Sequence, residues 1–328
     1  MGSLDAALSD RPPVVRGRRR SGRLILGRMS SSEQHLKGTA IVAIGVVVLS
    51  FDALFVRLSE TTAWNVVFWR GWMTAGALLA YMVVRSPRKW FESYREGGWP
   101  LVVAAAMMGV GLLLFPLSVT HTVVANTVVI LATAPFFAAV FTWMFLGEVV
   151  PGRTWAAIGV VVVGTAAVFW GGLSAGGTSG DLFALAAAVS FGANMTWLRL
   201  HRHLPRIPIV CLCGLISACI AAPMAAPAEL TGSGVMVLSV SGFVQMPLAM
   251  VLVTIGTRYL PAAEVSLLLL IETVLGPVWV GIVLGEVPST ATYVGGTVVV
   301  ATLVVHSWIG LRAARRARTT TLTAALDK

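Results

Sequence analysis

The sequence predicts an all-α integral membrane protein of ten transmembrane helices, arranged as two inverted-topology five-helix repeats. Three observations carry this prediction: the composition, the spacing of the apolar runs and an internal duplication. Of the 328 residues, 57% are apolar and 12% are charged, and the charged share is about half that of an average soluble domain. A soluble core does not need so many apolar residues, whereas ten bilayer-spanning helices of ~20 residues each would use them.

The apolar residues gather in ten runs, each bounded by charged residues, Pro or Gly. Because lipid offers no partner for an unpaired backbone N–H or C=O, every run that crosses the membrane is predicted to be a helix. The predicted spans are 39–58, 64–84, 99–117, 122–145, 153–171, 181–200, 207–226, 235–257, 261–284 and 290–310.

Lys and Arg are distributed unevenly between the segments that connect these spans. If the N-terminus is cytoplasmic, 22 of the 24 basic residues fall in cytoplasmic segments, and the exceptions are Arg57 and Arg70. The positive-inside rule therefore predicts a multi-pass protein of the cell (cytoplasmic) membrane with both termini in the cytoplasm. The basic tails 1–37 and 311–328 are then cytoplasmic, and the first is expected to be disordered near anionic lipid headgroups.

Short motifs recur in the same order in the two halves of the chain. The matches are Ser50-Phe51-Asp52-Ala53 with Ser190-Phe191-Gly192-Ala193, Leu146-Gly147-Glu148-Val149 with Leu284-Gly285-Glu286-Val287, and Val160–Val162 with Val298–Val300. The predicted units are 38–171 and 181–310, joined by a flexible Gly/Ser linker at 172–180. Five spans per unit is an odd number, so the second unit must enter the membrane in the opposite orientation. Secondary transporters often use this architecture, with the substrate bound between the repeats.

Ionisable side chains in the middle of a span are costly, so each is a candidate functional group. Asp52 and Arg70 lie about nine residues to either side of the first predicted turn, which places both roughly 13 Å below the outer boundary. Adjacent antiparallel helices would then bring them together. Two interpretations stay open: a static ion pair, or an Arg70 that binds a substrate carboxylate when Asp52 releases it.

The ninth predicted span carries a second group of candidates. Glu272 lies near its middle and Glu264 about two turns nearer the cytoplasm, and the two point within about 80° of one another. Pro277 removes a backbone donor beside Glu272, and the predicted kink would suit proton or cation binding. The alternatives are a protonated, hydrogen-bonded Glu272 and a Glu264 that reaches the membrane interface.

Further candidates come from amide, aromatic and proline residues in the spans. Asn126 aligns with Glu264 in the repeat, and interhelical hydrogen bonding is its favoured interpretation. Trp69 and Trp279 lie deep enough to line a substrate pocket, and Pro135 is the second predicted helix kink.

Several motifs together resemble a known family. They are Arg70-Gly71, Ala134-Pro135 followed by Leu146-Gly147-Glu148, and Glu272 followed by Pro277 and Leu284-Gly285-Glu286. Over most of 38–310 the chain resembles the EamA-like members of the drug/metabolite transporter superfamily. The resemblance implies a ten-helix transporter, often an exporter of amino acids, metabolites or toxic compounds.

The predicted function is export of a small organic metabolite, such as an amino acid, by alternating access with proton coupling. The alternative is a membrane scaffold or assembly protein that transports nothing. The sequence has no phosphate-binding Gly-x-x-x-x-Gly-Lys-[Ser/Thr] loop and no His-Glu-x-x-His or Gly-x-Ser-x-Gly motif, so an enzyme is not expected. No cofactor or metal is expected either. The expected partners are a small-molecule substrate and the lipid bilayer, with a homodimer left open, and no nucleic acid.

Overall fold

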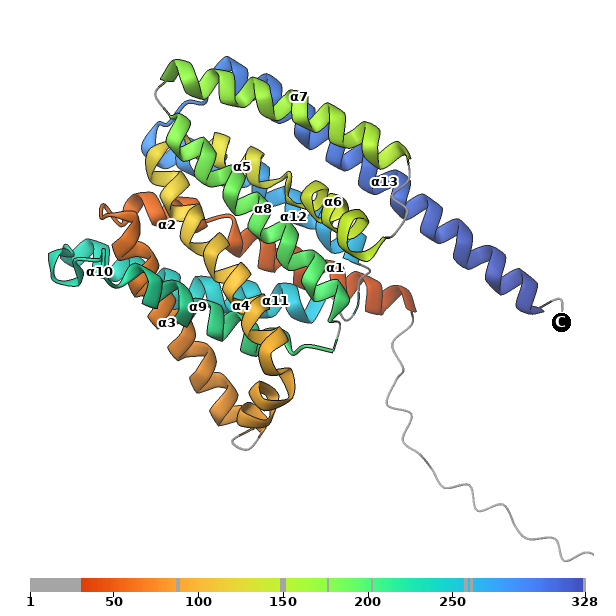
Figure 1. Cartoon of the computed structure of the whole chain (residues 1–328), viewed down its shortest axis with the longest axis horizontal. Coiled ribbons are helices and arrows are strands. Elements are labelled where there is room, and N and C mark those ends of the chain that lie inside the picture. The colour runs from red at the N-terminus through yellow and green to blue at the C-terminus, as the bar shows by residue number, and fades with distance from the viewer. Residues whose placement is uncertain are drawn as a thin grey trace, which may run out of the picture.

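The computed structural model of the chain describes residues 31–86, 89–147, 152–175, 177–201, 203–256, 259 and 262–326. This part is helical apart from short connections (Figure 1). The first half contains α1 (Ser31–Leu49), α2 (Asp52–Leu58), α3 (Ala63–Arg85), α4 (Lys89–His121), α5 (Val124–Leu131), α6 (Ala134–Leu146) and α7 (Gly152–Ala175). The second contains α8 (Thr178–Leu200), α9 (Arg206–Ala221), the 3₁₀ turn Pro227–Glu229, α10 (Gly232–Ser239), the π-helical turn Val240–Gln245, α11 (Met246–Gly256), α12 (Ala262–Leu284) and α13 (Thr290–Leu326).

Six helical stretches of the described residues are long and apolar enough to cross a membrane. Four shorter apolar helices accompany them, at Gly152–Val168, Arg206–Ala221, Ile271–Leu284 and Thr290–His306. Each predicted apolar run falls on one of these ten stretches. The prediction of an all-helical chain with several helices able to cross a membrane is therefore confirmed, and the count of ten spans stays a prediction.

Two of the predicted runs are interrupted helices. The first run is divided at Ser50 and Phe51 into α1 and α2, and the fourth is divided at Ala132 and Thr133 into α5 and α6. Pro135 explains the second break, because its ring nitrogen cannot donate to the carbonyl four residues earlier. The other predicted kink residue, Pro277, lies inside α12, which is assigned as one helix from Ala262 to Leu284.

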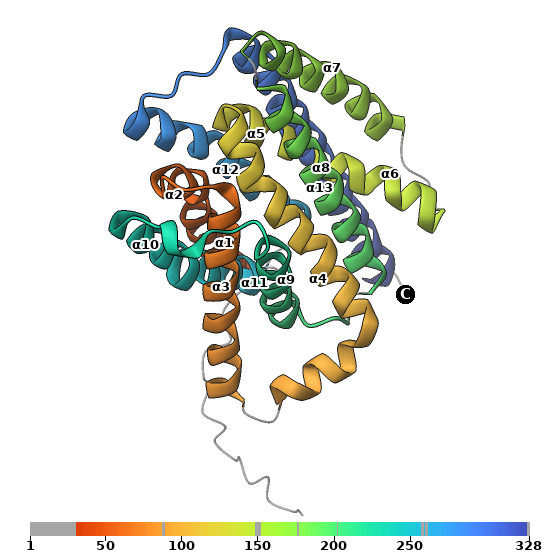
Figure 2. The same cartoon turned by 60° about the vertical axis from the view of Figure 1, so that its left-hand side comes forward.

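The helices pack in pairs that join the first half of the chain to the second. Helix α3 packs on α9, and α7 on α13, which runs beside it along one flank (Figures 1 and 2). Likewise α4 packs on α8, α1 on α11 and α5 on α12. The bundle is thus held together by contacts between the two halves as well as within them.

Glycines make two of these crossings unusually close. A Cβ atom placed on Gly71 of α3 would lie 2.5 Å from the carbonyl oxygen of Gly214 in α9, and one placed on Gly214 would lie 2.9 Å from that of Gly71. Gly164 of α7 and Gly295 of α13 face each other's carbonyl oxygens in the same reciprocal way. A larger residue at any of these positions would push the helices apart.

Helix bounds differ from the sequence prediction at the ends of the two units. Helix α1 begins at Ser31, inside the tail expected to be disordered, and residues 1–30 lie outside the described part. Helices α7 and α8 extend through most of the predicted flexible linker 172–180, leaving a break only around Gly177. Helix α13 continues into the basic tail as far as Leu326. The helices thus extend into segments that composition alone predicts to be loops or tails.

Five connections gather at one end of the bundle. Contacts link the end of α2 to the α4–α5 turn, the α4–α5 turn to the start of α8, and the α12–α13 connection to the end of α2. The connection after α9 joins this group, because the backbone N–H of Ala226 donates to the side chain of Asn65 at the start of α3. We call this end the Arg57 end.

Candidate functional site

Arg70 and Asp52 form a buried ion pair. Arg70 Nη1 lies 2.8 Å from Asp52 Oδ1, and each side chain is 6% exposed. Asp52 is the first residue of α2, where the free N–H groups of a helix start favour a negative charge. The interruption between α1 and α2 therefore creates the position that holds the carboxylate. The predicted pairing of Asp52 with Arg70 is confirmed. At a rise of 1.5 Å per residue, the pair lies about 10 Å from the C-terminal end of α2 and the N-terminal end of α3.

A buried amide satisfies the backbone that this interruption leaves free. Gln245, in the π-helical turn, donates from Nε2 to the carbonyl oxygens of Val48 (3.2 Å) and Leu49 (3.4 Å) at the end of α1. Ser241 donates to its Oε1 atom. The last carbonyls of α1 therefore have partners without lipid or water, as a helix end inside a bilayer requires.

Aromatic side chains lie against the same interruption. Trp279 of α12 stacks on Phe51, with ring centroids 4.8 Å apart, and donates its indole N–H to Ser50 Oγ at 2.9 Å. Trp69 of α3 packs against the same apolar cluster. Its buried indole nitrogen has no hydrogen-bond partner within the described part of the chain. Both predicted pocket tryptophans thus lie near the Asp52–Arg70 pair.

Glu272 of α12 lies one turn before Gly276, and a Cβ atom placed on Gly276 would lie 3.8 Å from the carbonyl oxygen of Ser50, two residues before Asp52. Glu272 is half-buried, and no hydrogen bond or ion pair joins it to another described residue. The side chain of Glu264, on the same helix, lies outside the described residues. Helix α12 therefore places Glu272 near the start of α2, although the sequence grouped it with Glu264, and the structure does not test the expected Glu264–Glu272 cavity.

The space beside Arg70 is small. A cavity of about 20 Å³ is lined by Arg70, Gly71, Thr74, Ser217 and Met246, among others. That volume holds about one water molecule. An organic solute can reach the charged group only if the surrounding helices separate.

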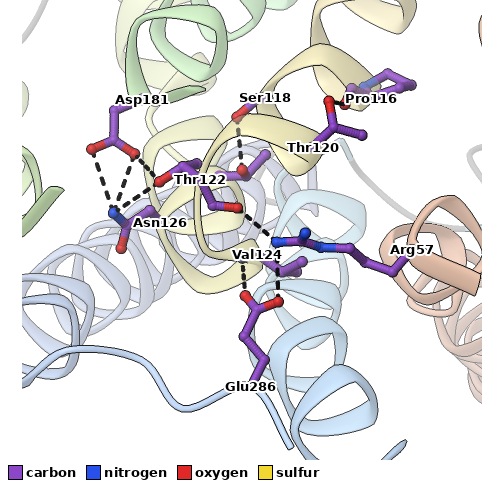
Figure 3. A network of polar contacts seen from close by, with 10 residues as sticks. Arg57, Pro116, Ser118, Thr120, Thr122, Val124, Asn126, Asp181 and Glu286 are labelled. Atoms are coloured by element: carbon purple, nitrogen blue, oxygen red, sulfur yellow. Dashed lines mark hydrogen bonds and ion pairs between the residues drawn. The ribbon is translucent and has the colours of Figure 1, made fainter. Parts of the chain in front are cut away.

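A second polar group lies at the Arg57 end (Figure 3). Arg57 Nη2, at the end of α2, donates to the carbonyl oxygen of Thr122 at 2.9 Å and pairs with Glu286 Oε2 at 3.1 Å. The other oxygen of Glu286 accepts the N–H of Val124, the first residue of α5, at 2.5 Å. A hollow of about 340 Å³ opens beside this group and includes Arg57, Thr122 and Glu286 in its wall.

Asp181 extends this group into the protein interior. The carboxylate, which is fully buried, accepts hydrogen bonds from Thr122 Oγ1 at 2.8 Å and from Asn126 Nδ2 at 3.1 Å. Thr292 of α13 donates to Asn126 Oδ1 at 2.6 Å. Asn126 therefore makes the interhelical hydrogen bonds predicted for it, but it lies in this second group rather than with Asp52.

The sequence prediction missed Arg57, Glu286 and Asp181 as site residues. In the sequence, Arg57 stands out only as an exception to the positive-inside rule, and Glu286 only as part of a repeated motif. Asp181 is only the first residue of a predicted span. One signal was available: Arg57 and Glu286 are opposite charges beside connections predicted to lie on the same side of the membrane.

Comparisons with known proteins agree with this description. A family model described as the EamA-like transporter family matches twice, at residues 36–170 and 178–308. A solved structure titled "Crystal structure of protein" matches with a TM-score of 0.61 and 17% identity, covering 84% of this chain and 97% of its own. At that identity the likeness shows the fold alone. A comparison with curated protein sequences finds no match. Because the two family matches span most of its residues, the chain belongs to the EamA-like transporter family.

Proposed function

We propose that this membrane protein is a secondary transporter that exports a small organic metabolite, such as an amino acid or a related compound, by alternating access. The observation that carries the proposal is the buried Asp52–Arg70 pair, with the half-buried Glu272 nearby, beside an interrupted helix. Buried charges within a membrane bundle are costly and mark solute or ion pathways. Transporters place such groups where a helix is broken, because the free helix end can bind charge.

The architecture of the proposal is ten spans in two inverted repeats. The packing pairs support it, since α3 pairs with α9 and α7 with α13, the second and fifth helices of each half. The reciprocal contacts of Gly71 with Gly214 and of Gly164 with Gly295 are what a two-fold axis produces, in which residue i meets j and j meets i. The family model also matches once in each half.

Each charged residue has a role in the proposed cycle. Arg70 binds the carboxylate of the solute, and Asp52 holds the guanidinium in place while the site is empty. Glu272 binds and releases the coupling proton. The water-sized cavity represents a closed form of the site, so separation of the helices on alternate sides admits and releases the solute.

The Arg57 end is proposed to face away from the cytoplasm. Its connections carry few basic residues, whereas the tails and the opposite connections hold most of the Lys and Arg, as the positive-inside rule requires. A single cysteine placed in 287–289 should react with an impermeant maleimide from outside intact cells, and one placed in 203–205 should not. The reverse pattern would overturn the orientation.

Flux through purified protein in liposomes tests the function. Vesicles loaded with a panel of radiolabelled amino acids should lose at least one of them faster than empty-lipid controls, with and without an imposed pH gradient. Arg70→Gln should abolish that flux. Arg85→Gln is the matched control, because it removes the same charge from an exposed position on the same helix. If no solute of an extended metabolite panel moves, the scaffold alternative replaces the transporter.

A further inference from the structure

The Asp52–Arg70 and Arg57–Glu286 ion pairs differ in exposure, which suggests different uses. The side chains of Asp52 and Arg70 are each 6% exposed, whereas those of Arg57 and Glu286 are 29% and 20% exposed. Separating a buried pair leaves two unsolvated charges. A pair that borders an open hollow can exchange its partner for water at little cost.

We propose that Arg57 and Glu286 form a latch that closes the Arg57 end and opens during transport. The inference rests on the proposed function and identifies two residues that control access to its site. The latch joins the two halves of the chain, because Arg57 ends α2 while Glu286 lies in the connection between α12 and α13.

The latch also holds the start of α5. Glu286 Oε1 accepts the first N–H of that helix, at Val124. The first N–H groups of a helix have no partner within the helix, and a carboxylate is the group that their partial positive charge favours. Glu286 thus clamps α5 and α2 together from the second half of the chain.

The apolar layer beneath the latch covers the charged group. Val124 and Val128 of α5 belong to one buried cluster, against which Phe51 and Trp279 pack, and Phe51 immediately precedes Asp52. Val128 also lies against α12, because a Cβ atom placed on Gly276 would be 4.0 Å from its methyl carbons. Movement of α5 away from α12 would therefore open a route from the hollow toward Asp52.

Asp181 is the fixed counterpart of the latch. Its carboxylate is fully buried, its partners Thr122 and Asn126 are neutral donors, and its helix is not part of the ion pair. It anchors the α4–α5 turn to α8 while the latch side moves. Opening therefore changes the Arg57–Glu286 contact first.

Cysteine accessibility tests the latch without any solute. The reporter is Val128→Cys, because Val128 is only 5% exposed in the closed form. The exposed Cys219 is replaced by Ala, whereas Cys211 and Cys213 are buried and are kept. A hydrophilic maleimide is added to purified protein in nanodiscs, and the labelling rate is measured. Glu286→Gln and Arg57→Gln should each raise the rate about tenfold, as expected when a charged hydrogen-bond partner is lost. The double variant should add little more, because the two changes remove one interaction.

A control and a salt titration complete the test. Glu229→Gln removes the same charge from an exposed position at the same end and should leave the rate unchanged. Raising NaCl to about 1 M should also speed labelling of the reporter protein that keeps the latch, because salt screens a part-exposed pair. This measurement does not depend on whether either variant folds.

The outcomes separate the latch from the proposed function. Rates that stay within about twofold of the control, or that multiply in the double variant, overturn the latch while leaving the transport proposal intact. Rates that rise as expected in a protein that moves no solute in liposomes support the latch and overturn the transporter.

Discussion

Breaking the Asp52–Arg70 pair should strongly destabilise the protein. At the observed N···O distance of 2.8 Å, Coulomb attraction with an effective dielectric of ~20 is about 6 kcal/mol. Desolvation of two charges offsets most of this attraction. The net value of the pair is therefore small, but the loss of one partner leaves a buried charge unpaired. The expected cost of Arg70→Gln is about 3–5 kcal/mol.

The two single changes should not be equal. Arg70→Gln leaves the Asp52 carboxylate without its cation, while α12, which carries the acidic Glu272, packs beside α2. Asp52→Asn leaves Arg70 with Glu272 still near, so part of the charge balance remains. We expect Asp52→Asn to cost less than Arg70→Gln, and the double change to cost less than the sum of the two.

Thermal unfolding of purified protein in detergent, followed by tryptophan fluorescence, measures these differences, and folded yield on size exclusion gives a second reading. Arg85→Gln, at an exposed position on the same helix, controls for loss of charge alone. Strictly additive losses would contradict the pairing argument. A double variant that folds well and still transports would show that the pair is structural, whereas one that folds and does not transport would support substrate binding by Arg70.

Three further predictions follow from the structure. Glu272→Gln should fold normally but lose the pH dependence of flux, and wild-type pH dependence in liposomes would make Glu272 a structural residue. Gly71→Ala should destabilise the protein by about 1–3 kcal/mol, because the added methyl group overpacks against α9. Gly76→Ala should stabilise it by up to about 1 kcal/mol, because a Cβ atom there meets nothing within 4 Å. Equal melting temperatures of the two variants would refute the close α3–α9 crossing. Asp181→Ala should cost about 1–3 kcal/mol, because Thr122 and Asn126 lose their buried acceptor, and an unchanged melting temperature would argue against the network.

The helices could be predicted from sequence because the bilayer imposes one requirement on all of them. A run long and apolar enough to cross must also satisfy its own backbone, so hydropathy alone places each predicted run on the observed helices. The interruptions could not be predicted in the same way. The break at Ser50 and Phe51 has no proline, and it depends on Gln245, which lies far along the chain and satisfies the carbonyls of α1.

The Asp52–Arg70 pair could be predicted because the depth of a residue in the membrane follows from its distance in sequence to the turn of a helical hairpin. Asp52 and Arg70 stand at similar distances from one turn, so their pairing needed no tertiary information. Asp181 was missed for the opposite reason. It lies at a helix start, where an acidic residue is ordinary, and only packing reveals that it is fully buried and bound by Thr122 and Asn126.

Gly71 shows how far local patterns reach. Small residues four apart on one face indicate a close helix contact, and both Gly71-xxx-Ala75 and Gly76-xxx-Ala80 fit that pattern. Only the first pattern lies at a helix crossing, because Gly71 packs against Gly214, whereas a Cβ atom on Gly76 would have no atom within 4 Å. The sequence predicts that a crossing occurs, and tertiary packing decides which face makes it.

The proposed repeat places the charged group in one half only. Asp52 aligns with Gly192, where a Cβ atom would lie 2.6 Å from the Cβ of Phe137, so no acidic side chain fits. Arg70 precedes Gly71, whose crossing partner Gly214 is preceded by the fully buried Cys213. The two halves thus share the helix-packing residues but not the Asp52–Arg70 pair. One central site needs one set of charged groups, whereas a bundle that opens at alternate ends needs the same packing in both halves.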